Sequence, residues 1–95
     1  MIVGIPREKS NEELRVAATP KTIKRLIKQG FEVMVETTAG ERSNFSDATF
    51  AEAGAKISDS ASDIYQSADV ILKVLAPEQS EINLMKKDQV CLSYL

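Results

Sequence analysis

Short apolar runs alternate with helix-like segments along the whole chain, and this alternation limits the possible folds more than any other feature. We expect strands at Ile2–Ile5, Phe31–Glu36, Ala55–Ser58, Asp69–Leu75 and Val90–Leu95. Strands that alternate with helices predict a parallel sheet with right-handed crossover connections. The sequence therefore predicts an α/β fold, a parallel-sheet domain of three layers that is Rossmann-like or flavodoxin-like.

The helix starts carry capping signals. A hydroxyl or short polar side chain just before a helix accepts a hydrogen bond from a free backbone N–H, and proline suits the first helical position. These signals occur at Thr19 before Pro20, at Ser46, and at Ser60. Phe45 and Phe50 flank the second of these starts with the spacing of a hydrophobic staple.

Glycines and charges predict where the helices end. Gly30 and Gly54 follow helical segments and suit the left-handed residue that commonly ends a helix. A fourth helix is predicted over Glu78–Lys87, because its acidic residues come early and its lysines late. The remaining acids at element starts are explained by capping, namely Asp47, Asp59, Asp63 and Asp69.

The segment Arg7–Thr19 is long for a connection between a strand and a helix. Loops at the carboxyl ends of parallel strands are where such folds bind ligands. Arg15 lies in this loop, and Lys73 interrupts the apolar run of another strand near its carboxyl end. If Ile2–Ile5 and Val70–Val74 are parallel neighbours, Arg15 and Lys73 border one crevice and suit an anionic ligand.

Both cations also have simpler explanations. Lys73 could extend into solvent from an exposed strand end, whereas a buried ammonium would need a partner. Arg15 could form a surface ion pair with Glu12 or Glu13. The sequence leaves these alternatives open.

The composition excludes several classes of function. The net charge of −2 gives no reason to expect a nucleic-acid partner, and there is no histidine. No metal-ligand spacing is visible, and no nucleophile stands beside a base. The single cysteine, Cys91, lies in an apolar run and is interpreted as a buried structural thiol. We therefore expect no catalytic, cofactor-binding or metal-binding residue in this chain.

Four segments in the same order resemble the alanine dehydrogenase and pyridine nucleotide transhydrogenase family. They are GIPREKSNEELRVAATP, GFEVMVETTAG, FSDATFAEAGAKI and ADVILKV. The wording RVAATP, and APE after the strand DVILKVL, is more similar to the amino-terminal part of the NAD(P) transhydrogenase alpha subunit than to alanine dehydrogenase.

The resemblance implies that residues 1–95 are an amino-terminal fragment of a domain that frames an NAD(H) cleft. Family members carry a second domain with a glycine-rich turn, and no G-x-G-x-x-G occurs here. We expect the fold to be incomplete at its C-terminus, because no helix follows the strand VCLSYL to cover it. We expect the fragment alone to be inactive and to bind no nicotinamide nucleotide tightly.

The function implied by the resemblance is hydride transfer between NADH and NADP⁺, coupled to proton translocation. The implied cofactors are NAD(H) and NADP(H) in the full complex. The implied partners are the rest of the alpha subunit, a membrane-embedded beta subunit and a second copy in a homodimer. The implied location is the cytoplasmic side of a bacterial inner membrane, with this chain itself soluble.

Two other functions are left open. In alanine dehydrogenases, an arginine and a lysine that match Arg15 and Lys73 bind the keto-acid substrate. A soluble NAD-dependent alanine dehydrogenase is therefore the first alternative. The second is a non-catalytic flavodoxin-like binding module, which the uncovered strand VCLSYL disfavours.

Overall fold

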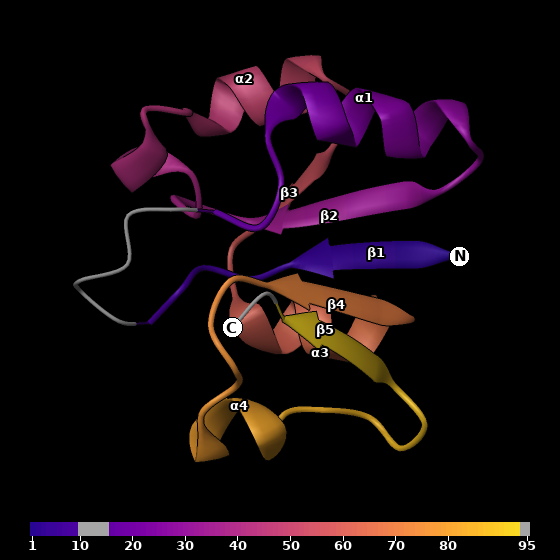
Figure 1. Ribbon diagram of the computed structural model, residues 1–95, viewed down its shortest axis with the longest axis vertical. Coiled ribbons are helices and arrows are strands. Elements are labelled where there is room, and N and C mark those ends of the chain that lie inside the picture. The colour runs from indigo at the N-terminus through magenta and orange to yellow at the C-terminus, as the bar shows by residue number, and fades with distance from the viewer. Residues whose placement is uncertain (10–15, 94–95) are drawn as a thin grey trace.

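The computed structural model describes residues 1–9 and 16–93, and in it five parallel strands form one sheet in the order β3-β2-β1-β4-β5 (Figure 1). The strands are β1 (Ile2–Ile5), β2 (Glu32–Glu36), β3 (Lys56–Ser58), β4 (Val70–Lys73) and β5 (Val90–Ser93). The helices are α1 (Pro20–Lys28), α2 (Asp47–Glu52), α3 (Ala61–Ser67) and α4 (Gln79–Ile82), with a short 3₁₀ helix η1 (Glu41–Ser43). The predicted α/β fold is confirmed.

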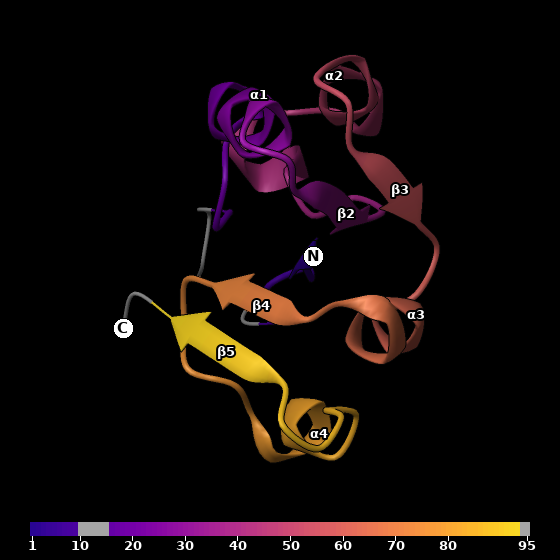
Figure 2. The same cartoon turned by 90° about the vertical axis from the view of Figure 1, so that its right-hand side faces the viewer.

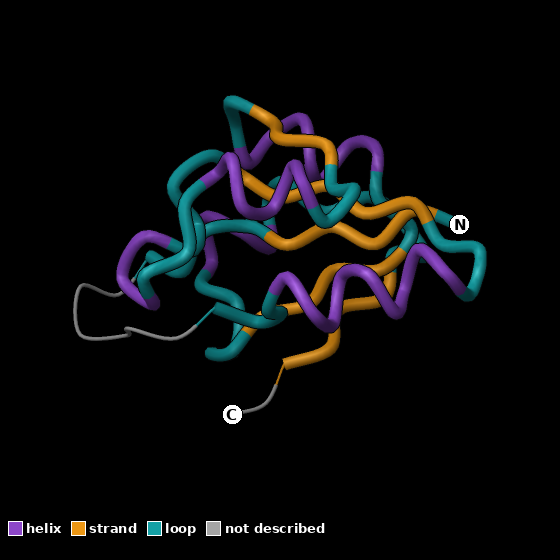
Figure 3. The backbone as a smooth tube through the Cα atoms, turned by 90° about the horizontal axis from the view of Figure 1, so that it is seen from above, coloured by secondary structure: helices purple, strands orange, loops and turns teal. Residues whose placement is uncertain are grey.

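Helices cover both faces of the sheet (Figure 2). On one face α1 and α2 bury a cluster that includes Ile23, Val35 and Phe50. On the other face α3 buries Ile64 and Tyr65 against the sheet. Strands covered on both sides need apolar residues at successive positions, which explains the near-continuous apolar runs. The alternation of helix and strand can be followed along the backbone in Figure 3.

The predicted caps are confirmed. The hydroxyl oxygens of Thr19, Ser46 and Ser60 each accept a hydrogen bond from the backbone N–H three residues later, at 3.2–3.3 Å. The Phe45 and Phe50 rings lie 5.9 Å apart between centroids, consistent with the predicted staple. Because these contacts are local, the sequence alone was enough to predict them.

The predicted helix Glu78–Lys87 is much shorter in the structure, where α4 ends at Ile82. Beyond it, the side-chain amide of Gln89 donates hydrogen bonds to the carbonyl oxygens of Tyr65 and Ala68, at 2.8 and 2.6 Å. Asp88 takes a positive φ of 66°. These features turn the chain back toward α3 and into β5. Directly after α4 the backbone N–H groups of Leu84 and Met85 bond to carbonyl oxygens three residues earlier, as in turns.

Three strands are also shorter than predicted. β2 and β3 each begin one residue late, at Glu32 and Lys56. β4 covers Val70–Lys73 rather than Asp69–Leu75. It ends early because the backbone N–H groups of Val74 and Leu75 donate to the Glu8 carboxylate. β5 is described as far as Ser93, and residues 94–95 lie outside the described part of the chain.

Edge strand β5 is poorly covered. Val90 is 49% exposed and Leu92 53% exposed, whereas Cys91 between them is half-buried. Burial raises the pKa of the Cys91 thiol, which agrees with a structural rather than a reactive role. None of the helices in the described ranges is long and apolar enough to cross a membrane.

Candidate functional site at the carboxyl edge of the sheet

Strands β1 and β4 are parallel neighbours, as predicted, with Val3 opposite Val70 and Gly4 opposite Ile71. The carboxyl ends of both strands therefore lie at the same edge of the sheet, where α/β folds commonly bind ligands. This placement brings Lys73, the last residue of β4, close to the loop that follows β1.

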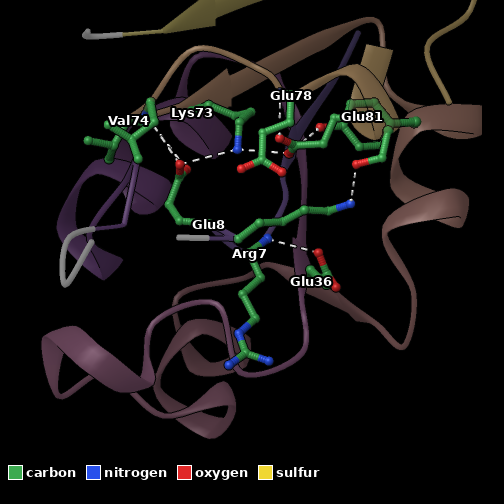
Figure 4. Close-up of polar contacts among 11 residues, drawn as sticks. Arg7, Glu8, Glu36, Lys73, Val74, Glu78 and Glu81 are labelled. Atoms are coloured by element: carbon green, nitrogen blue, oxygen red, sulfur yellow. Dashed lines mark hydrogen bonds and ion pairs between the residues drawn. The ribbon is translucent and has the colours of Figure 1, made fainter. Parts of the chain in front are cut away.

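Lys73 is 1% exposed and does not extend into solvent, so that alternative is wrong. Its Nζ lies 2.8 Å from Glu81 Oε2 and donates a 3.2 Å hydrogen bond to Glu8 Oε1 (Figure 4). Glu8 and Glu81 are themselves 4% and 2% exposed. The buried ammonium thus has the partners that burial requires.

Glu8 joins the loop after β1 to the end of β4. Its Oε2 accepts the backbone N–H of Val74 at 3.0 Å, and its Oε1 accepts that of Leu75 at 3.2 Å. The carboxylate thereby takes over the backbone groups that would have extended β4. Sequence reasoning missed Glu8 because it is one of several charged residues in the loop.

Glu81, at the third position of α4, completes this group. Its Oε2 also accepts a 3.1 Å hydrogen bond from the Tyr65 hydroxyl, and its Oε1 accepts the backbone N–H of Glu78 at 3.0 Å. We call Glu8, Tyr65, Lys73 and Glu81 the Lys73 cluster. The only sequence signal for it was a lysine inside an apolar strand.

The contacts within the Lys73 cluster shift the pKa values of Lys73, Glu81 and Tyr65. Burial by itself lowers the pKa of Lys73, but the hydrogen bond to Glu81 and the charge of Glu8 outweigh burial and raise that pKa. Burial likewise raises the pKa of Glu81, and the Glu78 N–H and Lys73 outweigh it, so that pKa is lowered. Burial, with the neighbouring Glu81 charge, strongly raises the pKa of Tyr65.

We expect the free energy of unfolding to be highest near neutral pH and to fall on both sides. A lowered pKa at Glu81 stabilises the fold above its ordinary value of 4.5, and this contribution is lost as pH falls through the folded-state pKa. Raised pKa values at Tyr65 and Lys73 stabilise the fold below about 10, and this contribution is lost as pH rises. Urea unfolding at a series of pH values would measure both effects.

The Glu81→Gln variant is the control for the acidic side. It should show a weaker dependence on pH below about 4.5, because glutamine cannot be protonated in this range. An unchanged acidic slope would contradict the assignment to Glu81.

A cavity of about 390 Å³ lies beside the Lys73 cluster at this edge. Its lining residues come from the loop after β1, the end of β2, η1, α3 and α4: Arg7, Glu8, Lys9, Glu36, Arg42, Ala61 and Glu81. Lys73 is not among the lining residues, so Glu8 and Glu81 stand between its ammonium and the cavity. The cavity therefore presents both cations and carboxylates.

Other predicted site features have mixed outcomes. Arg15 lies in residues 10–15, outside the described part of the chain, so its role stays a prediction. Two of the acids expected to cap their own elements instead bind other parts of the chain. Asp47 accepts hydrogen bonds from the Thr37 hydroxyl and the Thr38 backbone N–H, and Asp69 accepts one from the backbone N–H of Ile2. In residues 1–9 and 16–93, no group of three metal-ligating side chains comes together.

Comparison with known proteins places this geometry in a family. The model for the "Alanine dehydrogenase/PNT, N-terminal domain" matches residues 4–95, nearly the whole chain. The chain belongs to the alanine dehydrogenase and pyridine nucleotide transhydrogenase family. The resemblance noted in the sequence is thereby confirmed.

Both branches of the family are close to this chain. It is 50% identical over its full length to the NAD(P) transhydrogenase subunit alpha of Haemophilus influenzae and covers 18% of that protein. It is 42% identical over its full length to the alanine dehydrogenase of Mycolicibacterium smegmatis and covers 26% of it.

Solved structures agree. A transhydrogenase from Sinorhizobium meliloti matches the whole chain with a TM-score of 0.95 and 37% identity, and the chain covers 28% of it. The chain thus spans between about a sixth and a third of the length of these relatives. Its fold is that of the amino-terminal domain in this family.

Proposed function

We propose that this chain is the amino-terminal part of an NAD(P) transhydrogenase alpha subunit, which transfers hydride between NADH and NADP⁺ coupled to proton translocation. The observation that carries the proposal is the 50% identity to such a subunit over all 95 residues, compared with 42% to an alanine dehydrogenase. The proposed partners are the rest of the alpha subunit, a membrane-embedded beta subunit and a second copy of the chain. Such a complex would place this domain on the cytoplasmic side of the bacterial inner membrane.

In this proposal the domain frames one side of the NAD(H) cleft with the carboxyl edge of its sheet. A bound nicotinamide nucleotide supplies or accepts the hydride. The raised pKa of Lys73 keeps the ammonium charged at neutral pH, so Lys73 contributes a fixed positive charge rather than a mobile proton. Arg15 is proposed as a cation that lines the cleft itself, whereas Lys73 acts from behind Glu8 and Glu81.

The positions of the four glycines support the proposal that the dinucleotide-binding turn is not part of this chain. Gly30 and Gly54 end helices with φ values of 99° and 107°, and Gly4 lies inside β1. Gly40 lies against the Phe50 ring, where a Cβ would not fit. Gly40 precedes only the three-residue 3₁₀ helix η1, and the four glycines are isolated, unlike those of a dinucleotide-binding turn. The glycine-rich turn is therefore proposed to lie in a second domain of the full-length protein.

The second candidate is an NAD-dependent alanine dehydrogenase, which the 42% identity over the full chain to one such enzyme favours. The two activities differ in the hydride acceptor, so assays of the full-length wild-type protein with its membrane partner separate them. We expect NADH to reduce an NADP⁺ analogue and pyruvate with ammonium to leave NADH unoxidised. Steady NADH oxidation that depends on pyruvate and ammonium would contradict the first proposal.

A substitution at Lys73 is a poor test of these two functions. Removing the ammonium leaves Glu8 and Glu81 buried without a counter-charge, so activity would fall through misfolding in either enzyme. The wild-type assay avoids this ambiguity because it changes only the substrate.

A further inference from the structure

Arg7 is held in place at the cavity by contacts on both sides of it. Pro6 before it is fully buried. The backbone N–H of Arg7 donates to Glu36 Oε1 at 2.8 Å, which fixes the loop to the end of β2. The carboxylate of Glu8 after it is bound by Lys73 and by two backbone N–H groups of the segment after β4. The main chain at Arg7 is therefore anchored to the ends of two strands.

The side chain of Arg7 has no comparable contact within the described residues. Its guanidinium points away from the Lys73 cluster (Figure 4), and no acceptor within residues 1–9 and 16–93 pairs with it. Lys9, which also lines the cavity, instead donates to Ser80 Oγ at 2.8 Å. The anchored main chain needs no further ordering when a ligand binds, and the exposed guanidinium, unpaired among the described residues, supplies a planar set of donors.

The local charge favours an anion. The carboxylates of Glu8 and Glu81 line the cavity, but both are paired with the buried Lys73 ammonium. Glu36 is the remaining lining carboxylate, and one of its oxygens is used by the Arg7 N–H. Among the residues that the structure describes, and with Lys73 counted, cations outnumber carboxylates around the cavity. From these described residues an oxyanion would meet a net positive charge, and the Arg7 guanidinium can bind it through two parallel hydrogen bonds.

We propose that Arg7 forms an oxyanion-binding subsite in this cavity and that Glu8 is the positioning residue that holds Arg7 there. The ligand group is a phosphate or a carboxylate, which share this chemistry. The proposal deepens the proposed function, because a phosphate is what a nicotinamide nucleotide would offer and a carboxylate is what a keto acid would offer.

The first test is calorimetric titration of the full-length protein with inorganic pyrophosphate and, separately, with pyruvate. We expect one of the two to bind and its affinity to fall about tenfold or more in Arg7→Ala, the size of effect of one lost charge-assisted interaction. Arg7→Lys should recover part of the loss, because it keeps the charge without the planar fork. Arg25→Ala, on the exposed face of α1, is the matched control and should bind as the wild type does.

The identity of the bound probe assigns the source of the oxyanion. Pyrophosphate binding that depends on Arg7 indicates a nucleotide phosphate, and pyruvate binding that depends on Arg7 indicates a keto acid. Equal affinities in Arg7→Ala and wild type for both probes would overturn the subsite. This test measures binding and not activity, so its outcome is separate from that of the proposed function. A protein that does not catalyse transhydrogenation can still show the Arg7 subsite, and a protein that does can still lack it.

The positioning role needs a separate comparison between Glu8→Gln and Glu81→Gln. Each removes one carboxylate from Lys73, but only Glu8 also anchors the loop that carries Arg7. Glu8→Gln should weaken binding of the anion that depends on Arg7, and Glu81→Gln should not. Equal weakening in the two variants would mean that the cluster acts only on stability and would overturn the role of Glu8. If Glu8→Gln does not fold, Glu8→Asp, which keeps the charge, replaces it and should give intermediate affinity.

Discussion

Replacement of Lys73 by methionine is expected to lower the free energy of unfolding by about 3–5 kcal/mol, the usual effect of breaking a buried ion pair. Methionine fills a similar volume, so the loss comes from charge rather than from a cavity. Glu8 and Glu81, both nearly fully buried, would be left without their ammonium partner. Urea unfolding followed by circular dichroism measures the change.

Two variants control this prediction. Lys28→Met, on the exposed last turn of α1, removes a charge that has no ion-pair partner among the described residues and should change stability by less than about 1 kcal/mol. Adding Glu8→Gln and Glu81→Gln to Lys73→Met should restore part of the loss, because the uncompensated charges are then gone. A loss of under about 1 kcal/mol in Lys73→Met alone would show that the cluster is not buried as described.

Replacement of Gly4 by valine is expected to destabilise the fold by about 1–3 kcal/mol, the typical result of overpacking. Gly4 lies in central strand β1, directly under α3. A Cβ there would come within 2.6 Å of Ile64 Cγ2 and 2.8 Å of Ala68 Cβ, so the helix would have to move away from the sheet. Thermal or urea unfolding would detect the loss.

The matched control is Glu32→Val in the neighbouring strand β2, where the side chain is exposed. Valine favours strands, so this variant should be neutral or slightly stabilising and separates overpacking from strand propensity. Gly4→Ala should lie between the wild type and Gly4→Val. A Gly4→Val protein as stable as the wild type would mean that α3 does not pack closely on β1.

Features that depend on neighbouring residues could be predicted from the sequence. The caps at Thr19, Ser46 and Ser60 involve groups three residues apart, so the sequence contains both partners. The adjacency of β1 and β4 followed from their apolar runs, because the most apolar parallel strands occupy the centre of a doubly covered sheet. The fold class and the edge of the sheet at which a site should lie were therefore determined by local pattern.

Features that depend on distant partners were decided only by the tertiary structure. Lys73 was visible in the sequence as a cation in an apolar strand, but Glu8 is 65 positions away and any of several acids could have paired with it. The same contact ends β4 early, because the Glu8 carboxylate binds the next two backbone N–H groups. The turn from α4 into β5 is likewise held by Gln89, which donates to the carbonyl oxygens of Tyr65 and Ala68. The choice between competing polar partners depends on which groups the fold buries together, since burial makes an unpaired charge or N–H costly.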